Sequence, residues 1–213
     1  MDTEPGTPNT TELTRVPQQA RSREKFDAIL GAALRLIHEK GYEQVSMREI
    51  AREVNLPIAS VYQYFPNKLA VVRQLWEGYT SELSVLLGAE LEAVAKDPCV
   101  ATFHRAVGNV IDHMVAHHRD NPAFLGIWRS VDGSPELRAL NRQDTLRVAD
   151  AIGAAVLKVR PDADPNAVVT RALIACETAS ATVKLAQELP TERLTGLYET
   201  LKSVLIEMLA EVQ

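Results

Sequence analysis

Apolar residues recur at intervals of three and four along nearly the whole chain, and no stretch alternates as a half-buried strand does. Between residues 22 and 40 the apolar residues form one helical face, which ends at Lys40-Gly41, where Gly suits a left-handed cap. That face contains Phe26, Ile29, Leu30, Ala33, Leu36 and Ile37. The pattern predicts an all-α fold of about nine helices.

Helix starts are marked by two kinds of signal. Ser46-Met-Arg-Glu49 has the spacing of a capping box, in which the two side chains satisfy backbone donors of the first turn. Four more starts are predicted where a capping residue precedes a proline. These are Asp97-Pro98, Asn121-Pro122, Ser134-Pro135 and Asp164-Pro165.

The 213 residues, 46% of them hydrophobic, are enough for one or two small domains with a core that needs no disulfide. Only two cysteines are present, so neither a disulfide framework nor a cysteine metal cluster is expected. No segment has the apolar length of a signal peptide or a membrane span. We therefore expect a cytoplasmic protein with no membrane contact.

The net charge of −5 hides an uneven distribution. Residues 15–73 carry ten Lys and Arg against six Asp and Glu, whereas residues 74–213 carry 13 against 19. This asymmetry is compatible with an N-terminal part that meets a polyanion and an acidic remainder with another role.

Two short helices separated by a tight turn are predicted between residues 46 and 68. The first spans residues 47–54 and the second spans residues 58–64, with Asn55-Leu56-Pro57 between them. Asn55 suits the turn because asparagine tolerates a positive φ. The apolar residues of this helix-turn-helix fall where it would pack on the preceding helix.

The second short helix has an outward face without acidic or basic residues. Its predicted members are Ile58, Ala59, Ser60, Tyr62, Gln63 and Tyr64. Hydroxyl, amide and apolar groups suit a helix in the DNA major groove, and Arg48 and Lys68 add positive charge at its flanks. The alternative is a packing module with half-buried surface tyrosines.

This segment resembles the DNA-binding domain of the TetR family of bacterial transcriptional repressors. The family pattern is T-x-x-x-I-A-x-x-A-G-V-S-x-G-T-x-Y-x-Y-F-x-x-K, and the chain departs from it at Val54-Asn55, Pro57 and Ala59. The resemblance covers about 50 residues in register, including the preceding Lys40-Gly41-Tyr42. The matching positions are Ser46, Ile50-Ala51, Leu56, Ser60, Tyr62, Tyr64-Phe65 and Lys68.

The resemblance implies a role for each side chain of the segment. Ser46, Tyr62, Tyr64 and Lys68 would contact phosphates. Arg48 and Gln63 would read base edges, and Ile58, Ala59 and Ser60 would touch thymine methyl groups or the backbone. Arg21 and Arg23 could reach the minor groove or nearby phosphates, or could serve only the solubility of the chain's start.

Three segments are expected: a mobile arm at residues 1–20, a DNA-binding domain at residues 21–68, and a helical effector-binding and dimerisation domain at residues 69–213. The last two long helices, near residues 165–189 and 191–212, are predicted to form a homodimer. The small residues of the first, which include Ala172, Ala175, Ala179, Ser180 and Ala186, would allow close approach to a second chain. An intramolecular core is the alternative.

An effector pocket is expected among the middle helices, and its apolar lining suits a hydrophobic or aromatic small molecule. The candidate ligand-binding residues are Trp76, Phe103, Val107, Ile111, Met114, Phe124, Trp128 and Cys176. His113 and His117 share a helix face beside Asp112, but a third metal ligand is missing there, so we expect no metal site and no cofactor.

Together these features predict a ligand-responsive regulator that binds a palindromic operator as a dimer, acts as a repressor and is released by its effector. The alternatives are a helical enzyme, a small-molecule carrier or an adaptor whose N-terminal helices are only structural. No phosphate loop, nucleophile elbow or paired metal motif favours an enzyme.

Overall fold

The computed structural model describes Leu13 and residues 20–194 and 196–210, and within these residues every regular element is a helix. The predicted all-α fold class is therefore confirmed. The expected mobile arm lies outside the described residues, apart from Leu13 and Ala20. None of the described helices is long and apolar enough to cross a membrane.

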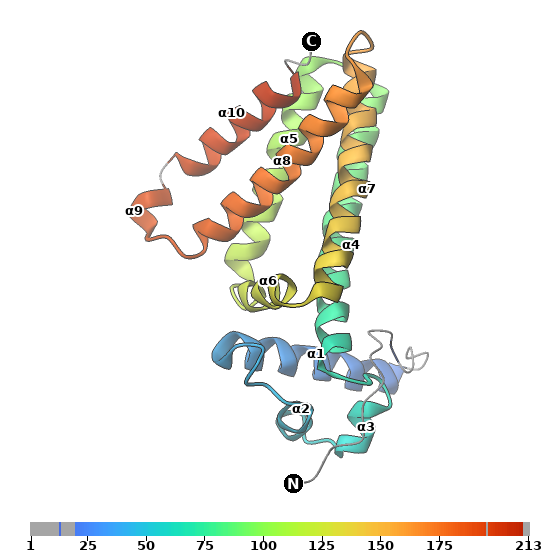
Figure 1. Cartoon of the computed structure of the whole chain (residues 1–213), viewed down its shortest axis with the longest axis vertical. Coiled ribbons are helices and arrows are strands. Elements are labelled where there is room, and N and C mark those ends of the chain that lie inside the picture. Colours follow the sequence, from blue (N-terminus) through green and yellow to red (C-terminus); the bar gives the residue numbers. More distant parts are fainter. Residues whose placement is uncertain (1–12, 14–19, 195, 211–213) are drawn as a thin grey trace. The chain divides into compact units, whose positions relative to one another are not determined.

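The chain divides into two compact units (Figure 1). Unit 1 contains Met1–Tyr79 and Ala123–Leu137, and unit 2 contains Thr80–Pro122 and Arg138–Gln213. This division by packing differs from the predicted boundary between residues 68 and 69, since the first turns of α4 and all of α6 belong to unit 1. The helices are α1 (Ala20–Lys40), α2 (Met47–Glu53), α3 (Ile58–Tyr62), α4 (Lys68–Lys96), α5 (Val100–Asp120), α6 (Phe124–Gly133), α7 (Pro135–Val159), α8 (Pro165–Ala186), α9 (Thr191–Leu194) and α10 (Leu197–Ala210).

In unit 1, α1 packs against both α2 and α6, and α2 packs against α3. The apolar face predicted from the spacing of α1 is buried except for Leu30, which is half-buried, and Gly41 ends the helix with φ 82°. Gly126 of α6 lets the two helices approach closely, because a Cβ there would lie 3.2 Å from the carbonyl oxygen of Ile37. Helix α6 is therefore an integral part of this unit although α5 separates it from α4 in sequence.

Unit 2 is built from α4 beyond Tyr79 together with α5, α7, α8, α9 and α10. Helices α5, α8 and α10 pack on one another. Arg147 of α7 donates a hydrogen bond to Ser84 of α4, and these two helices run side by side (Figure 1). Gly153 of α7 lies against Val169 of α8, where an added Cβ would meet a methyl group at 3.1 Å.

Two of the four predicted starts at prolines are confirmed. Asp164 caps α8 by accepting from the backbone N–H of Ala167 at 3.0 Å, and Ser134 precedes α7 at Pro135. The other two are wrong. Helix α5 begins at Val100 with Cys99 as its cap, and Asn121 ends α5, where its side-chain amide donates to the carbonyl oxygen of His117.

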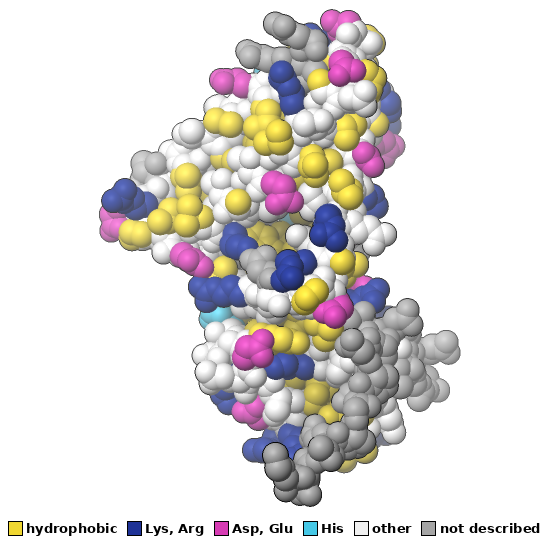
Figure 2. Space-filling model, in the orientation of Figure 1, with side chains coloured by type: hydrophobic (Ala, Val, Ile, Leu, Met, Phe, Trp, Pro, Cys, Tyr) yellow, Lys and Arg dark blue, Asp and Glu magenta, His cyan; other side chains and the backbone are white. Residues whose placement is uncertain are grey.

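The prediction that the small residues of α8 face a second chain is wrong for four of them. Ala172, Ala175, Ala179 and Ala186 are buried within the single chain, because α8 packs against α5 and α10. The outward side of α8 instead carries Ile174 and Leu185, which are 49% and 53% exposed. Val204 of α10 is also exposed, and Figure 2 shows hydrophobic side chains over these helices.

Candidate nucleic-acid interface

Helices α2 and α3 form a helix-turn-helix whose local geometry follows from the sequence. The side-chain oxygen of Ser46 accepts from the backbone N–H of Glu49 at 3.2 Å, and the Glu49 carboxylate accepts from the backbone N–H of Ser46 at 2.9 Å. This is the predicted capping box. The turn contains Asn55 with φ 52°, as expected, and Pro57 precedes α3 without a side-chain cap.

A small apolar core holds α3 in place. Ile50 of α2, Val61 of α3 and Phe65 are fully buried, and the ring of Phe65 stacks on Phe26 of α1 with centroids 4.8 Å apart. The end of α3 is thus fixed to α1 by aromatic contact, which keeps its outer face in a constant orientation.

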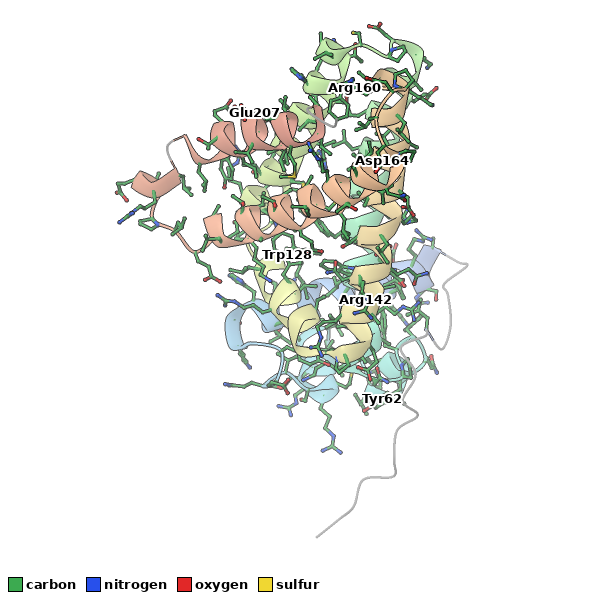
Figure 3. All side chains as sticks on the ribbon, turned by 45° about the horizontal axis from the view of Figure 1, so that its top comes forward. Tyr62, Trp128, Arg142, Arg160, Asp164 and Glu207 are labelled. Atoms are coloured by element: carbon green, nitrogen blue, oxygen red, sulfur yellow. The ribbon has the colours of Figure 1, made fainter. Side chains whose placement is uncertain are left out.

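The outer face of α3 and the start of α2 carry most of the predicted DNA-binding residues. Ala59, Tyr62 and Gln63 are exposed, and the phenol ring of Tyr62 lies on the outside of the unit (Figure 3). Ile58 and Ser60 are half-buried. Ser46 and Arg48 are exposed at the start of α2. These seven residues therefore lie in or cap two short helices of unit 1 that pack on each other.

The prediction that Tyr64 lies on the outer face of the helix-turn-helix is wrong. The sequence pattern places it on the outer face, but only 7% of the residue is exposed, and its ring meets Phe26 edge-on at 6.1 Å. Its hydroxyl lies 2.9 Å from the Ser22 hydroxyl of α1. Helix α3 ends at Tyr62 rather than at residue 64, which turns the Tyr64 side chain inward.

Lys68 lies at the start of α4, half-buried, and its ammonium group is already engaged. It donates to the carbonyl oxygen of Tyr42 and lies 4.0 Å above the centre of the Tyr42 ring. Burial lowers the pKa of Lys68, and the carboxylates of Glu43 and Glu49 oppose that shift. This contact ties α4 to the loop before α2, and a phosphate contact by Lys68 stays a prediction.

Ion pairs neutralise part of the basic charge around the helix-turn-helix. Arg35 pairs with Glu53 at 3.2 Å and Lys40 pairs with Glu49 at 3.1 Å. Hydrogen bonds from the Ser46 backbone and from Lys40 hold the pKa of Glu49 at about 2, so this carboxylate is ionised at neutral pH. Arg48 takes part in none of the ion pairs found among the described residues, and its charge faces solvent.

The predicted effector-binding residues are divided between the two units. Trp76, Phe124 and Trp128 lie in unit 1, whereas the other five lie in unit 2. Phe103, Ile111 and Met114 are buried in α5. The other two, Val107 and Cys176, are only partly buried, and burial raises the pKa of the Cys176 thiol to about 12. The thiol is therefore protonated and unreactive at neutral pH.

An aromatic cluster of α4 and α6 contains the three residues of unit 1 together with Tyr79, which is absent from the predicted set. The Tyr79 ring lies 4.7 Å from Phe124, 5.7 Å from Trp76 and 6.1 Å from Trp128. Because Tyr79 comes three residues after Trp76, helical spacing could have placed the two residues on the same helix face. The indole N–H of Trp76 is buried without a hydrogen-bond partner in the described part of the chain.

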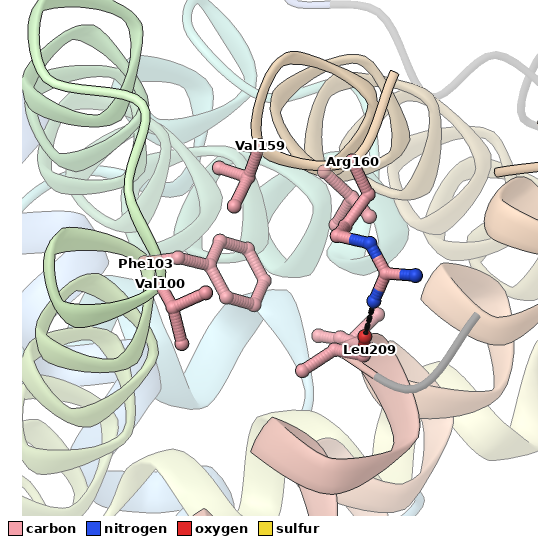
Figure 4. Close-up of a pocket in the computed structure, with 7 residues that line it drawn as sticks. Val100, Phe103, Val159, Arg160 and Leu209 are labelled. Atoms are coloured by element: carbon pink, nitrogen blue, oxygen red, sulfur yellow. Dashed lines mark hydrogen bonds between the residues drawn. The ribbon is translucent and has the colours of Figure 1, made fainter. Parts of the chain in front are cut away.

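One hollow in unit 2 lies where α5 begins and α7 and α10 end (Figure 4). Its empty volume is about 240 Å³, part of which is open solvent. Of the predicted effector-binding residues only Phe103 lines it. Arg160 crosses its edge and donates to the carbonyl oxygen of Ala210 at 2.6 Å, so that the end of α10 is held to α7.

Comparison with protein families accounts for most of the chain. Residues 29–75 match the model of bacterial regulatory proteins of the tetR family, and residues 101–212 match a tetracyclin repressor-like C-terminal domain. The chain belongs to the TetR family. TetR proteins are DNA-binding regulators rather than enzymes as a class, and the first match contains α2 and α3 in full.

Two curated relatives are similar over part of their length. An uncharacterized HTH-type transcriptional regulator, YuxN of Bacillus subtilis, is 29% identical over 98 residues, which are 46% of this chain and 33% of YuxN. The HTH-type transcriptional regulator BetI of Cronobacter sakazakii is 24% identical over 137 residues, which are 64% of this chain and 66% of BetI. The chain thus spans a third of one relative and just under two thirds of the other.

Solved structures show the TetR fold over nearly the whole chain. The SmeT–triclosan complex superposes with a TM-score of 0.67 at 18% identity, covering 89% of this chain and 92% of SmeT. At this identity the likeness concerns the fold.

Proposed function

We propose that the chain is a ligand-responsive transcriptional repressor, which binds a palindromic operator as a homodimer and is released by a small-molecule effector. The observation that carries the proposal is the outer face of α3. It presents Tyr62 and Gln63 without any carboxylate, and it is held to α1 by a buried core. A helix with these side chains suits the major groove of DNA.

The proposed contacts are of two kinds: some position the protein on the DNA, and others read the base sequence. Ser46 and Tyr62 contact phosphates, which fixes the register of the protein on the duplex. Arg48 reads guanine O6 and N7, and Gln63 reads adenine. The remaining three residues, Ile58, Ala59 and Ser60, contact thymine methyl groups or the backbone.

The outward side of α8 and α10 supports a homodimer through these helices. Ile174, Leu185 and Val204 are large apolar residues that solvent reaches in the single chain. Removing such side chains from water favours association at about 25 cal/mol per Å². A two-fold dimer presents two copies of α3 to two half-sites, which explains why the operator should be an inverted repeat.

The effector is proposed to be a hydrophobic or aromatic molecule, as the buried aromatic cluster of α4 and α6 suggests. The SmeT complex contains triclosan, so a small molecule is bound by a protein of this fold. Release would follow if the effector binds more tightly to a conformation in which the two α3 helices no longer match two half-sites.

Selection of bound sequences from a random duplex pool at moderate salt tests the proposal. The expected result is enrichment of an inverted repeat, with affinity falling steeply as salt rises. A folded protein that enriches no sequence would overturn the proposal. Enrichment of a single asymmetric site would overturn the dimeric mode of binding.

A further inference from the structure

The Ser22–Tyr64 contact joins two segments far apart in the sequence. Ser22 lies in the first turn of α1, and Tyr64 follows the end of α3; their hydroxyl oxygens are 2.9 Å apart. In Figure 1 the first turn of α1 lies over α3. The edge-on contact of the Tyr64 ring with Phe26 fixes the direction in which the Tyr64 hydroxyl points.

Two arginines flank Ser22. Arg21 and Arg23 are both exposed, and the first turn of α1 contains no acidic residue. Successive side chains of an α-helix are rotated by about 100°, because one turn contains 3.6 residues. Since Ser22 points inward to Tyr64, the two arginines point outward on either side of it.

We infer that the Ser22–Tyr64 hydrogen bond positions Arg21 and Arg23 against the DNA phosphates beside α3, an inference that rests on the proposed function. Tyr64 is then a positioning residue that acts on DNA through α1, in place of the phosphate contact expected from the sequence. The first turn of a helix is its least constrained part, because its N–H groups lack partners within the helix. The hydroxyl pair holds that turn beside the exposed Tyr62 and Gln63.

The inference predicts that DNA binding by Arg21 and Arg23 depends on the partly buried hydroxyl pair of Ser22 and Tyr64. Tyr64→Phe keeps the ring and its contact with Phe26, and it removes only the hydroxyl. Ser22→Ala removes the partner oxygen from the opposite side. Either change should free the first turn of α1 and weaken both arginine contacts, and the double variant should bind no more weakly than the weaker single variant.

The experiment measures operator affinity by fluorescence anisotropy over a series of salt concentrations, using the full chain and the selected inverted repeat. Tyr64→Phe is expected to weaken binding roughly fivefold and to reduce the slope of log affinity against log salt by about 0.9 for each phosphate that the arginines no longer neutralise. Arg119→Ala, which removes an exposed arginine of α5, is the matched control and should leave both quantities unchanged.

A second arm replaces Arg21 and Arg23 by alanine in the wild-type and the Tyr64→Phe backgrounds. The replacement should weaken binding clearly in the first background and by less than twofold in the second. Equal effects in both backgrounds, or an unchanged salt slope in Tyr64→Phe, would overturn the inference. If the wild-type protein selects no operator, the proposed function fails instead, so the two failures are distinguishable.

Discussion

At the scale of single residues, the basic side chains around the helix-turn-helix differ in whether they already bind a group of the protein. Arg35, Lys40 and Lys68 have partners on the protein, whereas Arg48 faces solvent. A cation without a protein partner can form a bidentate contact with guanine without first breaking another interaction. Arg48 is therefore the best basic candidate for reading a base among these four residues.

Arg48→Ala should lower the preference for the cognate base pair by about 1–3 kcal/mol while the protein keeps its affinity for non-specific DNA to within a few-fold. Gln63→Ala should do the same at a different position of the half-site. Competition binding with operators mutated at each position measures both. If Arg48→Ala weakened binding equally at every sequence, Arg48 would be a phosphate contact.

His118 makes the stability of the protein depend on pH. Its side chain is buried in α5, and burial, helped by the neighbouring His117, lowers its pKa from 6.5 to about 4. Because the folded state favours the neutral imidazole, this contribution to stability is fully present above pH 6.5. It is lost as the pH falls from 6.5 to 4, by up to about 3 kcal/mol.

His118→Gln retains a hydrogen-bonding side chain that does not titrate. Its free energy of unfolding should therefore depend less on pH between 6.5 and 4 than that of the wild type. Urea unfolding at several pH values gives the free energy of unfolding of each protein. The carboxylates titrate in both proteins, so their effect cancels in the difference between the two values. Parallel pH profiles would contradict the assignment.

At the scale of elements, the contact between α1 and α6 depends on one glycine. A Cβ at Gly126 would lie 3.2 Å from both the Cγ2 and the carbonyl oxygen of Ile37, and 3.4 Å from the Cα of His38. Two of these three neighbours are backbone atoms, which do not move without shifting α1. The contact is therefore sensitive to the addition of a single methyl group.

Gly126→Ala should destabilise unit 1 by about 1–3 kcal/mol despite the better helix propensity of alanine. Gly78→Ala in α4 is the matched control, because among the described residues no atom lies within 4 Å of its added Cβ apart from its chain neighbours and the nearby backbone of its own helix. That change should be neutral or should stabilise the protein by up to about 1 kcal/mol. Urea unfolding measures the free energy of unfolding of the two variants. Equal stabilisation of both would show that α6 shifts to accommodate the added methyl group.

At the scale of the whole molecule, the proposed dimer depends on apolar side chains that the single chain leaves exposed. Ile174 of α8 is 49% exposed, and Leu146 of α7 is 48% exposed. The two residues are therefore matched in character and exposure, but only the first lies on the helices proposed to form the dimer.

Ile174→Glu should shift the protein to a monomer at micromolar concentration, because it places a charge in an apolar interface. Leu146→Glu should remain a dimer. Light scattering gives the mass of each variant, and operator binding should weaken only for Ile174→Glu. Dissociation by Leu146→Glu alone would place the interface on α7.

Sequence alone determined the features that depend on residues within one or two turns of each other. The capping box of Ser46 and Glu49, the positive φ of Asn55 and the glycine end of α1 are all predictable, because each is a local interaction between near neighbours. The all-α class and the helix-turn-helix follow from the same short-range signals, and the family resemblance rests on that segment.

Only the tertiary structure decided which face of each element meets which partner. It turned Tyr64 inward to Ser22, buried the small residues of α8 within the chain and placed α6 with α1. Helical spacing shows that a residue lies on an apolar face, but not whether that face meets its own chain, another chain or a ligand. That choice depends on packing between residues far apart in the sequence, where the shapes of many side chains must fit together.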